Sequence, residues 1–192
     1  MTAKTRNVLL TSIALFFFAA LMVVVVCSRK KTERPEPEIL SKIAAGGATV
    51  QFIKVKLFYY SETSALLQPI EREIEVPEIR EELYKKFIAL LLTSSGGLIM
   101  PLPDGVQLRS VFYLPKKEML VLDFNDNLIN AFPGGTAAEL EFVYFIVDNI
   151  CYNFQEIKKV KILSGGNENK TLAGHIDLEK PFFPDFSRMK IE

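Results

Sequence analysis

The most constraining feature of this sequence is an uncharged apolar run near its N-terminus. Residues 8–27 read VLLTSIALFFFAALMVVVVC and contain no charged side chain. In a helix that rises about 1.5 Å per residue they would span about 30 Å, the thickness of a bilayer's hydrocarbon core. The run is longer than the apolar region of an ordinary signal peptide, and no small-residue cleavage site follows it. It therefore predicts an uncleaved transmembrane anchor, preceded by a basic tail at residues 1–7.

A lipoprotein signal is the alternative for the same segment. Cys27 stands at the end of the apolar run, where a lipidated cysteine would be found. A lipobox has a small residue just before the cysteine, whereas this chain has Val24, Val25 and Val26 there. This mismatch favours the membrane helix, and Cys27 stays a candidate lipidation site.

Charge divides the chain into a basic N-terminal part and a mildly acidic remainder. Residues 1–49 carry seven basic and three acidic groups, and residues 50–192 carry sixteen and twenty. The basic part adjoins the predicted anchor, where anionic headgroups would attract it. The acidic remainder argues against nucleic acid as a partner. Charge alone does not decide on which side of the membrane the domain lies.

The rest of the chain divides into a linker, one domain and a short tail. Residues 28–49 are charged, contain prolines and end in small residues, which predicts a flexible linker with room for a short helix around residues 39–45. Residues 50–184 predict a single folded domain, and residues 185–192 a C-terminal tail. The two cysteines of the chain are too few for a disulfide framework or a zinc site.

Hydrophobic periodicity predicts an α+β domain with the order β-β-α-β-β-α-β-β. The predicted strands are residues 50–60, 69–76, 106–112, 119–124, 157–163 and 171–178, and the predicted helices follow Pro77 and begin at Thr136. In the second strand, three glutamates alternate with apolar residues, which indicates a solvated face. Thr136 and Glu139 have the spacing of a capping box. We expect a mostly antiparallel sheet with both helices on one face.

Several of these segments together resemble the GerMN domains of sporulation and germination proteins. The similar segments are VKLFYY at 55–60, ALLL before residues 94–97, LPDGVQLRSVFY at 102–113, MLVLDFNDNL at 119–128, GGTAAELEFVYFIVDNICYNF at 134–154, VKILSGG at 160–166 and TLAGHIDLEKPF at 171–182. The resemblance covers about residues 55–184. The chain departs from the family at residues 148–151, where an Asn-Thr-Leu type run is more usual, and at Asn125, where Ser is frequent.

The resemblance implies an exported, non-catalytic domain on a membrane or lipid anchor. The fold is similar to the ring-building modules of secretion machines, which are structural and have no active site. It implies a single-pass protein of the cytoplasmic membrane whose domain lies outside the cytoplasm. Its partners would be an unknown envelope protein, a second copy of the chain or peptidoglycan.

The residues themselves do not form a recognisable catalytic set. His175 is the only histidine, and no G-x-S-x-G sequence accompanies it. Asp123 and Asp126 could form a carboxylate pair, but they fit a strand end and a turn better. The glycine pairs at 134–135 and 165–166 lack the lysine and spacing of a phosphate loop. Cys151 fits a buried thiol, so we expect no enzyme activity, cofactor or metal.

The second helix carries the candidate interaction surface. Phe142, Tyr144 and Phe145 interleave with its predicted apolar stripe, so some of these aromatic side chains should be exposed. The favoured function is a protein–protein assembly module of the cell envelope. The alternative is a module that binds a cell-wall glycan or a small ligand, because aromatic faces stack on sugars. Its candidate residues are Tyr59, Tyr60, Tyr113 and Tyr144.

Overall fold

A computed structural model describes residues 38–43, 49–61, 64–93 and 99–191 of the chain. The predicted basic tail, the apolar run at residues 8–27, Cys27 and most of the predicted linker lie outside the described residues. Among the residues that the structure describes, no helix is both long and apolar enough to span a bilayer.

The first sheet consists of three antiparallel strands in the order β1-β2-β3. They are β1 (Ile39–Ile43), β2 (Thr49–Ser61) and β3 (Ser64–Glu75). The long run of β-branched and aromatic residues in β2 favours an extended strand. The glutamates of β3 are exposed as expected, and they pair with lysines: Glu71 with Lys56, Glu73 with Lys42 and Glu75 with Lys86.

The second sheet is mixed and has the order β4-β5-β6. A hairpin joins β4 (Leu108–Leu114) to β5 (Met119–Phe124) through the 3-10 turn η1 (Pro115–Lys117). By contrast, β6 (Lys159–Ser164) is parallel to β5. A helix connects these two strands, and a crossover of that length returns the chain in the same direction. β5 and β6 are thus parallel, whereas the other described strand pairs are antiparallel.

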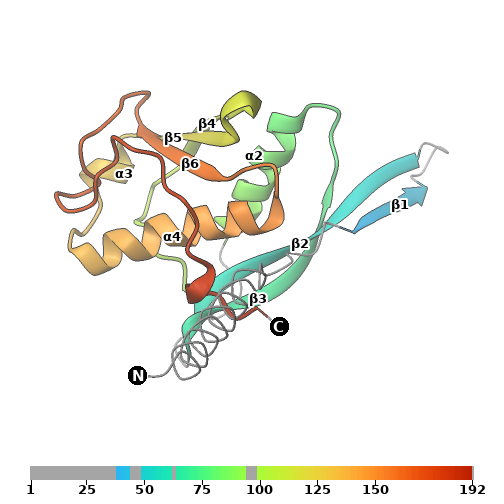
Figure 1. The fold of residues 1–192 in the computed structure, drawn as a ribbon, viewed down its shortest axis with the longest axis horizontal. Helices are drawn as coiled ribbons and strands as arrows, with labels where there is room; N and C mark the ends of the chain where they lie inside the picture. The colour runs from blue at the N-terminus through green and yellow to red at the C-terminus, as the bar shows by residue number, and fades with distance from the viewer. Residues whose placement is uncertain (1–37, 44–48, 62–63, 94–98, 192) are drawn as a thin grey trace, which may run out of the picture. The chain divides into compact units, whose positions relative to one another are not determined.

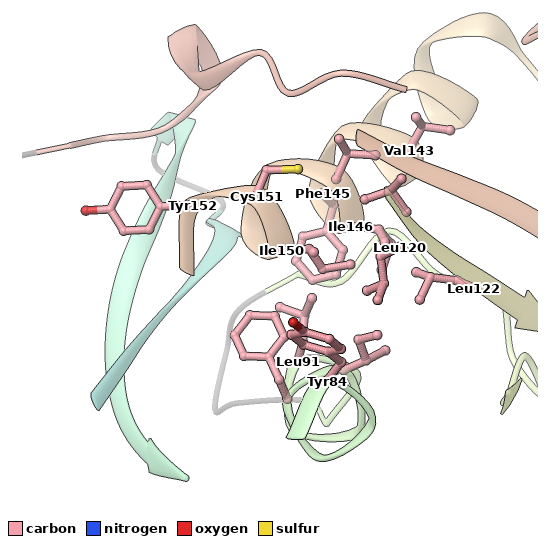
Figure 2. Close-up of a cluster of buried hydrophobic side chains, with 14 of the residues drawn as sticks. Tyr84, Leu91, Leu120, Leu122, Val143, Phe145, Ile146, Ile150, Cys151 and Tyr152 are labelled. Atoms are coloured by element: carbon pink, nitrogen blue, oxygen red, sulfur yellow. The ribbon is translucent and has the colours of Figure 1, made fainter. Parts of the chain in front are cut away.

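In the described residues, the α-helices that accompany the two sheets are α2 (Arg80–Leu91), the short α3 (Asn127–Asn130) and α4 (Thr136–Asn153). α4 contacts β2 of the first sheet and β6 of the second, and Figure 1 shows it passing between them. Figure 2 shows Leu120 and Leu122 of β5 pointing towards Ile146 and Ile150 of α4, while Tyr152 lies on the side of α4 that faces the first sheet. Both sides of α4 are therefore packed.

The α+β class is confirmed, but the single sheet with two helices on one face is not observed. Two sheets enclose α4 instead, which buries nearly all of its second half. The segment 39–43, predicted as linker or short helix, is strand β1, because β2 offers it an open edge at residues 49–53. Residues 171–178 form only one isolated bridge, between Thr171 and Asp177, and not the predicted strand.

A β-bulge changes which alternate residues of β4 face inwards. In the sequence, Leu108, Ser110 and Phe112 alternate with Arg109 and Val111. The register shifts between Leu108 and Ser110. After this shift, Val111 and Tyr113 face inwards, and Phe112 faces outwards. Val111 is buried as a result, and 53% of Phe112 is exposed.

Two asparagines of α4 complete an edge of β2. β1 pairs with β2 only as far as Ile53. Beyond that, Asn153 Oδ1 accepts from Lys56 N (2.8 Å) and Asn153 Nδ2 donates to Lys56 O (2.7 Å). Asn149 repeats the pattern one turn earlier with Phe58 N (2.7 Å) and Phe58 O (2.9 Å). These amides, here called the asparagine ladder, supply the hydrogen bonds that a neighbouring strand would otherwise make.

We expect Asn149→Ala to lower the free energy of unfolding by about 2–5 kcal/mol, because it leaves a buried N–H and a buried C=O of Phe58 without partners. Chemical denaturation monitored by circular dichroism measures this change. Asn130→Ala, on the exposed end of α3, is the matched control and should change stability by less than about 0.5 kcal/mol. Equal effects of the two substitutions would show that the ladder contributes nothing.

Candidate functional site

The burial of α4 encloses a carboxyl group, Asp148, beside the C-terminal segment. Asp148 is completely buried, and its Oδ1 accepts a hydrogen bond from Asp185 N (2.7 Å). Its Oδ2 has no hydrogen-bond partner among the described residues. Burial is the main cause that raises the pKa of Asp148 to about 7, since the charged form loses its hydration.

The residues around Asp148 come from the C-terminal segment, which is held at several points. The guanidinium of Arg188 lies over the ring of Tyr144 on α4, 4.8 Å from its centroid. Lys190 N donates to Leu67 O of β3 (3.0 Å) next to a parallel bridge between Leu67 and Met189. The predicted tail is therefore packed against α4 and the outer edge of β3.

Tyr60, at the end of β2, faces the same region. Its hydroxyl oxygen is buried and has no hydrogen-bond partner within the described part of the chain. Burial raises the pKa of Tyr60, and the carboxylate of Glu141 adds to this effect. Asp148 can therefore exchange a proton near neutral pH, whereas the pKa of Tyr60 lies above its ordinary value of 10.

We expect the stability of the domain to fall as pH rises from about 4 to about 7, because the pKa of Asp148 is higher in the folded chain than its ordinary value of 3.8. Asp148→Asn removes this titration and keeps an acceptor for Asp185 N. The variant should therefore be more stable than the parent chain at pH 8 by more than about 1 kcal/mol. The difference should shrink at pH 5.

Thermal unfolding of both chains across this pH range measures the difference directly. A constant difference between the two chains from pH 5 to pH 8 would contradict a raised pKa of Asp148. The comparison of the two chains cancels the titration of every other group, provided that those groups keep their surroundings.

A mainly apolar groove of about 610 Å³ opens beside Tyr60. Residues 99–103 line it together with Phe132 and Ala138, and Tyr60 and Glu141 contribute polar groups. Ile99 N donates to Tyr60 O (2.9 Å), so this wall of the groove continues the hydrogen bonding along the edge of β2. Open apolar grooves with a few polar groups are the usual form of binding sites in proteins.

The structure corrects two of the three predicted surface aromatics. Phe142 and Phe145 are fully buried: Phe142 packs against Phe124 of β5, and Phe145 packs against Tyr59 of β2. They cannot form an interaction surface, because a second sheet covers the side of α4 that was expected to face solvent. Tyr144 is half-buried beneath Arg188.

Glu139 does not close a capping box. Gly135 is the N-cap of α4, and no side chain caps this helix end. Glu139 is fully buried and instead accepts hydrogen bonds from Ile176 N (2.9 Å) and from His175 N (3.3 Å). Its Oε1 lies 2.7 Å from His175 Nδ1. Burial by itself would raise the pKa of Glu139, but these hydrogen bonds hold it below its ordinary value.

The other candidate residues have structural contacts. Asp123 accepts a hydrogen bond from Gly166 N (2.7 Å) and lies 3.6 Å from the guanidinium of Arg109. Asp126 is exposed at the start of α3, close to Gly165, and Cys151 is a buried thiol. No group of three metal-binding side chains occurs in the portion of the chain that the structure describes.

Sequence reasoning missed the polar residues of α4 that organise the site. The sequence pattern assigned no structural role to Asp148, Asn149 or Asn153. One feature of the sequence could have indicated their role. Two asparagines lie four residues apart within an almost continuous apolar run, and buried amides need defined hydrogen-bond partners. Their partners on β2 lie about ninety residues earlier in the chain, so no local pattern could identify them.

Comparisons with known proteins place the fold among sporulation-related domains. The family model "Germane: Sporulation and spore germination" matches residues 56–170. A Clostridium perfringens crystal structure at 2.5 Å, described as a candidate lipoprotein, is 21% identical over 73% of this chain and 93% of its own, with a TM-score of 0.49. The tandem GerMN domains of the Bacillus subtilis sporulation protein GerM are 16% identical over 70% of this chain and 45% of theirs, with a TM-score of 0.46. No curated protein matches the chain.

Proposed function

The chain belongs to the Germane family of sporulation and spore germination domains, as its resemblance to GerMN domains predicted, and from this premise we propose that it is a membrane-anchored assembly module of the cell envelope. In this proposal the domain recruits a neighbouring envelope protein and performs no chemical step. The anchor is the apolar run at residues 8–27, or a lipid on Cys27, and the domain lies outside the cytoplasm.

The observation that carries this proposal is the open apolar groove beside Tyr60. About 47% of Ile99 is exposed at the groove, although a side chain of this size is normally buried. Glu141 is exposed at the same groove, and no lysine or arginine of the described ranges pairs with it. The groove therefore suits an apolar segment of a partner protein that carries a cationic side chain for Glu141.

The polar residues of the domain support a binding role more than a catalytic one. The His175 ring is held by the buried carboxylate of Glu139, and Asp123 is held by the backbone of Gly166. These contacts hold loops in place, and the residues that make them do not line a common cavity. The groove itself is lined by prolines and apolar side chains, with Glu141 as its carboxylate.

No observation favours the glycan-binding alternative. Tyr59 is buried, and Tyr113 packs edge-to-face on Tyr84 with ring centroids 5.5 Å apart. Tyr60 borders the groove, whereas Tyr144 lies beneath Arg188. The four tyrosines therefore do not present a common face on which a sugar could stack.

Site-specific photo-crosslinking in cells tests the docking role of the groove. A photoreactive phenylalanine analogue at Ile99 of the full chain should give a discrete adduct, whereas the same group at the exposed Ile79 should not. Glu141→Lys should abolish the Ile99 adduct by repelling the partner's cation. An Ile99 adduct that persists unchanged in Glu141→Lys, or that equals the Ile79 background, would contradict docking in the groove.

Protease access tests the topology separately. Protease added to spheroplasts should cut the domain, and protease added to inverted membrane vesicles should leave it intact. The reverse pattern would place the domain in the cytoplasm and would overturn its role outside the cytoplasm, while leaving the fold and the groove unaffected.

A further inference from the structure

The outer face of β4 and β5 is mainly apolar and partly exposed near the turn that joins them. Leu120 and Leu122 of β5 point towards the helices, so their neighbours Met119 and Val121 point away. On β4, Leu114 lies opposite Met119 and Phe112 lies opposite Val121. The exposed fractions of Phe112 and Leu114 are 53% and 37%. Side chains alternate between the two faces of a strand. Leu120 and Leu122 are therefore buried, while the apolar neighbours Met119 and Val121 point outwards.

Phe183 extends this surface past β6. Phe182 pairs with Val160, which places the 181–183 segment along the outer edge of β6. Phe183 is 61% exposed, and the Lys159 ammonium lies 5.8 Å from the centroid of its ring. We call the surface formed by Phe112, Leu114, Met119, Val121 and Phe183 the lysine-rimmed strip.

Four lysines lie at one end of this strip. Lys116 and Lys117 form the turn between β4 and β5, directly after Leu114. Lys158 and Lys159 are held beside that turn, because both of their N–H groups donate to Glu118 O (2.8 and 3.3 Å). None of the four forms an ion pair with another residue in the described part of the chain. The end of the strip therefore has an excess of positive charge.

We propose that the lysine-rimmed strip rests on the surface of an anionic lipid bilayer. Its apolar side chains enter the headgroup region, and its lysines contact lipid phosphates. Two forces hold proteins at such a surface: burial of apolar area and attraction to anionic lipids. The strip offers both, because its exposed aromatic and aliphatic side chains lie beside lysines that form no ion pair with the described residues. The folded part is acidic overall, so the basic rim also sets which face approaches the membrane.

The length of the connecting segment keeps the strip within reach of a bilayer. Ten residues, 28–37, separate the apolar run from Glu38, the first described residue. Ten extended residues span at most about 36 Å, which is comparable to the size of the domain. This step rests on the proposed anchor, whereas the apolar and basic character of the strip does not. A tethered domain meets the bilayer at a high effective concentration, so weak contacts suffice.

The chain contains no tryptophan, which allows a clean fluorescence test. The full chain with Phe112→Trp is reconstituted into vesicles of phosphatidylcholine, alone or mixed with phosphatidylglycerol, that contain brominated lipid. We expect a blue shift and quenching of the new fluorophore in the mixed vesicles and little of either in phosphatidylcholine alone. High salt should reverse the quenching, because it screens the lysines. Ile79→Trp, an exposed position on a different element, should stay unquenched in both.

Charge reversal on the rim provides the matched pair of variants. Lys116→Glu with Lys117→Glu, added to Phe112→Trp, should weaken docking by roughly five-fold or more for each lysine. Lys85→Glu with Lys86→Glu reverses two adjacent lysines on α2 and should leave the quenching unchanged. Thermal unfolding of each variant confirms that the fold is kept.

The outcomes separate this proposal from the proposed anchor. Flotation of the chain with vesicles after alkaline carbonate extraction reports on the anchor alone. If the chain floats but Phe112→Trp is quenched no more than Ile79→Trp, the strip does not bind lipid and the proposal is overturned. Quenching that is equal in the rim variant and the α2 variant also overturns it. A photoreactive phenylalanine analogue at Phe112 tests for a protein partner. A crosslink from it to an acidic protein, without quenching of Phe112→Trp by lipid, would overturn the proposal and assign the strip to that protein.

Discussion

The asparagine ladder between α4 and β2 is the contact on which the rest of the domain depends. Asn149 and Asn153 bind both polar groups of Phe58 and of Lys56, as a neighbouring strand would. A helix is thereby joined to the edge of a sheet by directional bonds, and not only by apolar packing. Because buried amide and carbonyl groups are costly to leave unpaired, this arrangement fixes both the position and the rotation of α4.

The position of α4 explains how its polar residues are used in the fold. Since α4 is covered on both sides, its polar residues must find partners in distant segments. Glu139 binds the 175–176 loop and Asp148 binds the backbone of Asp185, so buried carboxyls attach the last part of the chain to the core. Carboxyl groups used in this way hold the structure together. The functions proposed for the domain instead use two surfaces, the groove beside Tyr60 and the lysine-rimmed strip.

These two surfaces differ in chemistry and belong to different sheets. The groove adjoins the end of β2 and carries the carboxylate of Glu141, whereas the strip lies on the outer face of β4 and β5 and carries lysines. If the domain is tethered as proposed, it would meet a cationic segment of a protein and an anionic bilayer through separate faces. Because the groove carries negative charge and the strip carries positive charge, the domain would be oriented relative to the membrane before a partner binds.

The sequence by itself determined most of the elements, the α+β class and the family. Strand β5 has the expected bounds, and α4 begins at Thr136 as predicted, because local propensity and periodicity act within a few neighbouring residues. Only the tertiary structure decided how these elements are divided between two sheets, and it therefore decided the site. Phe142 and Phe145 are buried, Phe112 is exposed after a bulge, and Asp148 is enclosed. The burial of Phe145 and Asp148 depends on contacts with residues far apart in the chain, and the exposure of Phe112 depends on how β4 pairs with β5. A pattern within one element encodes neither.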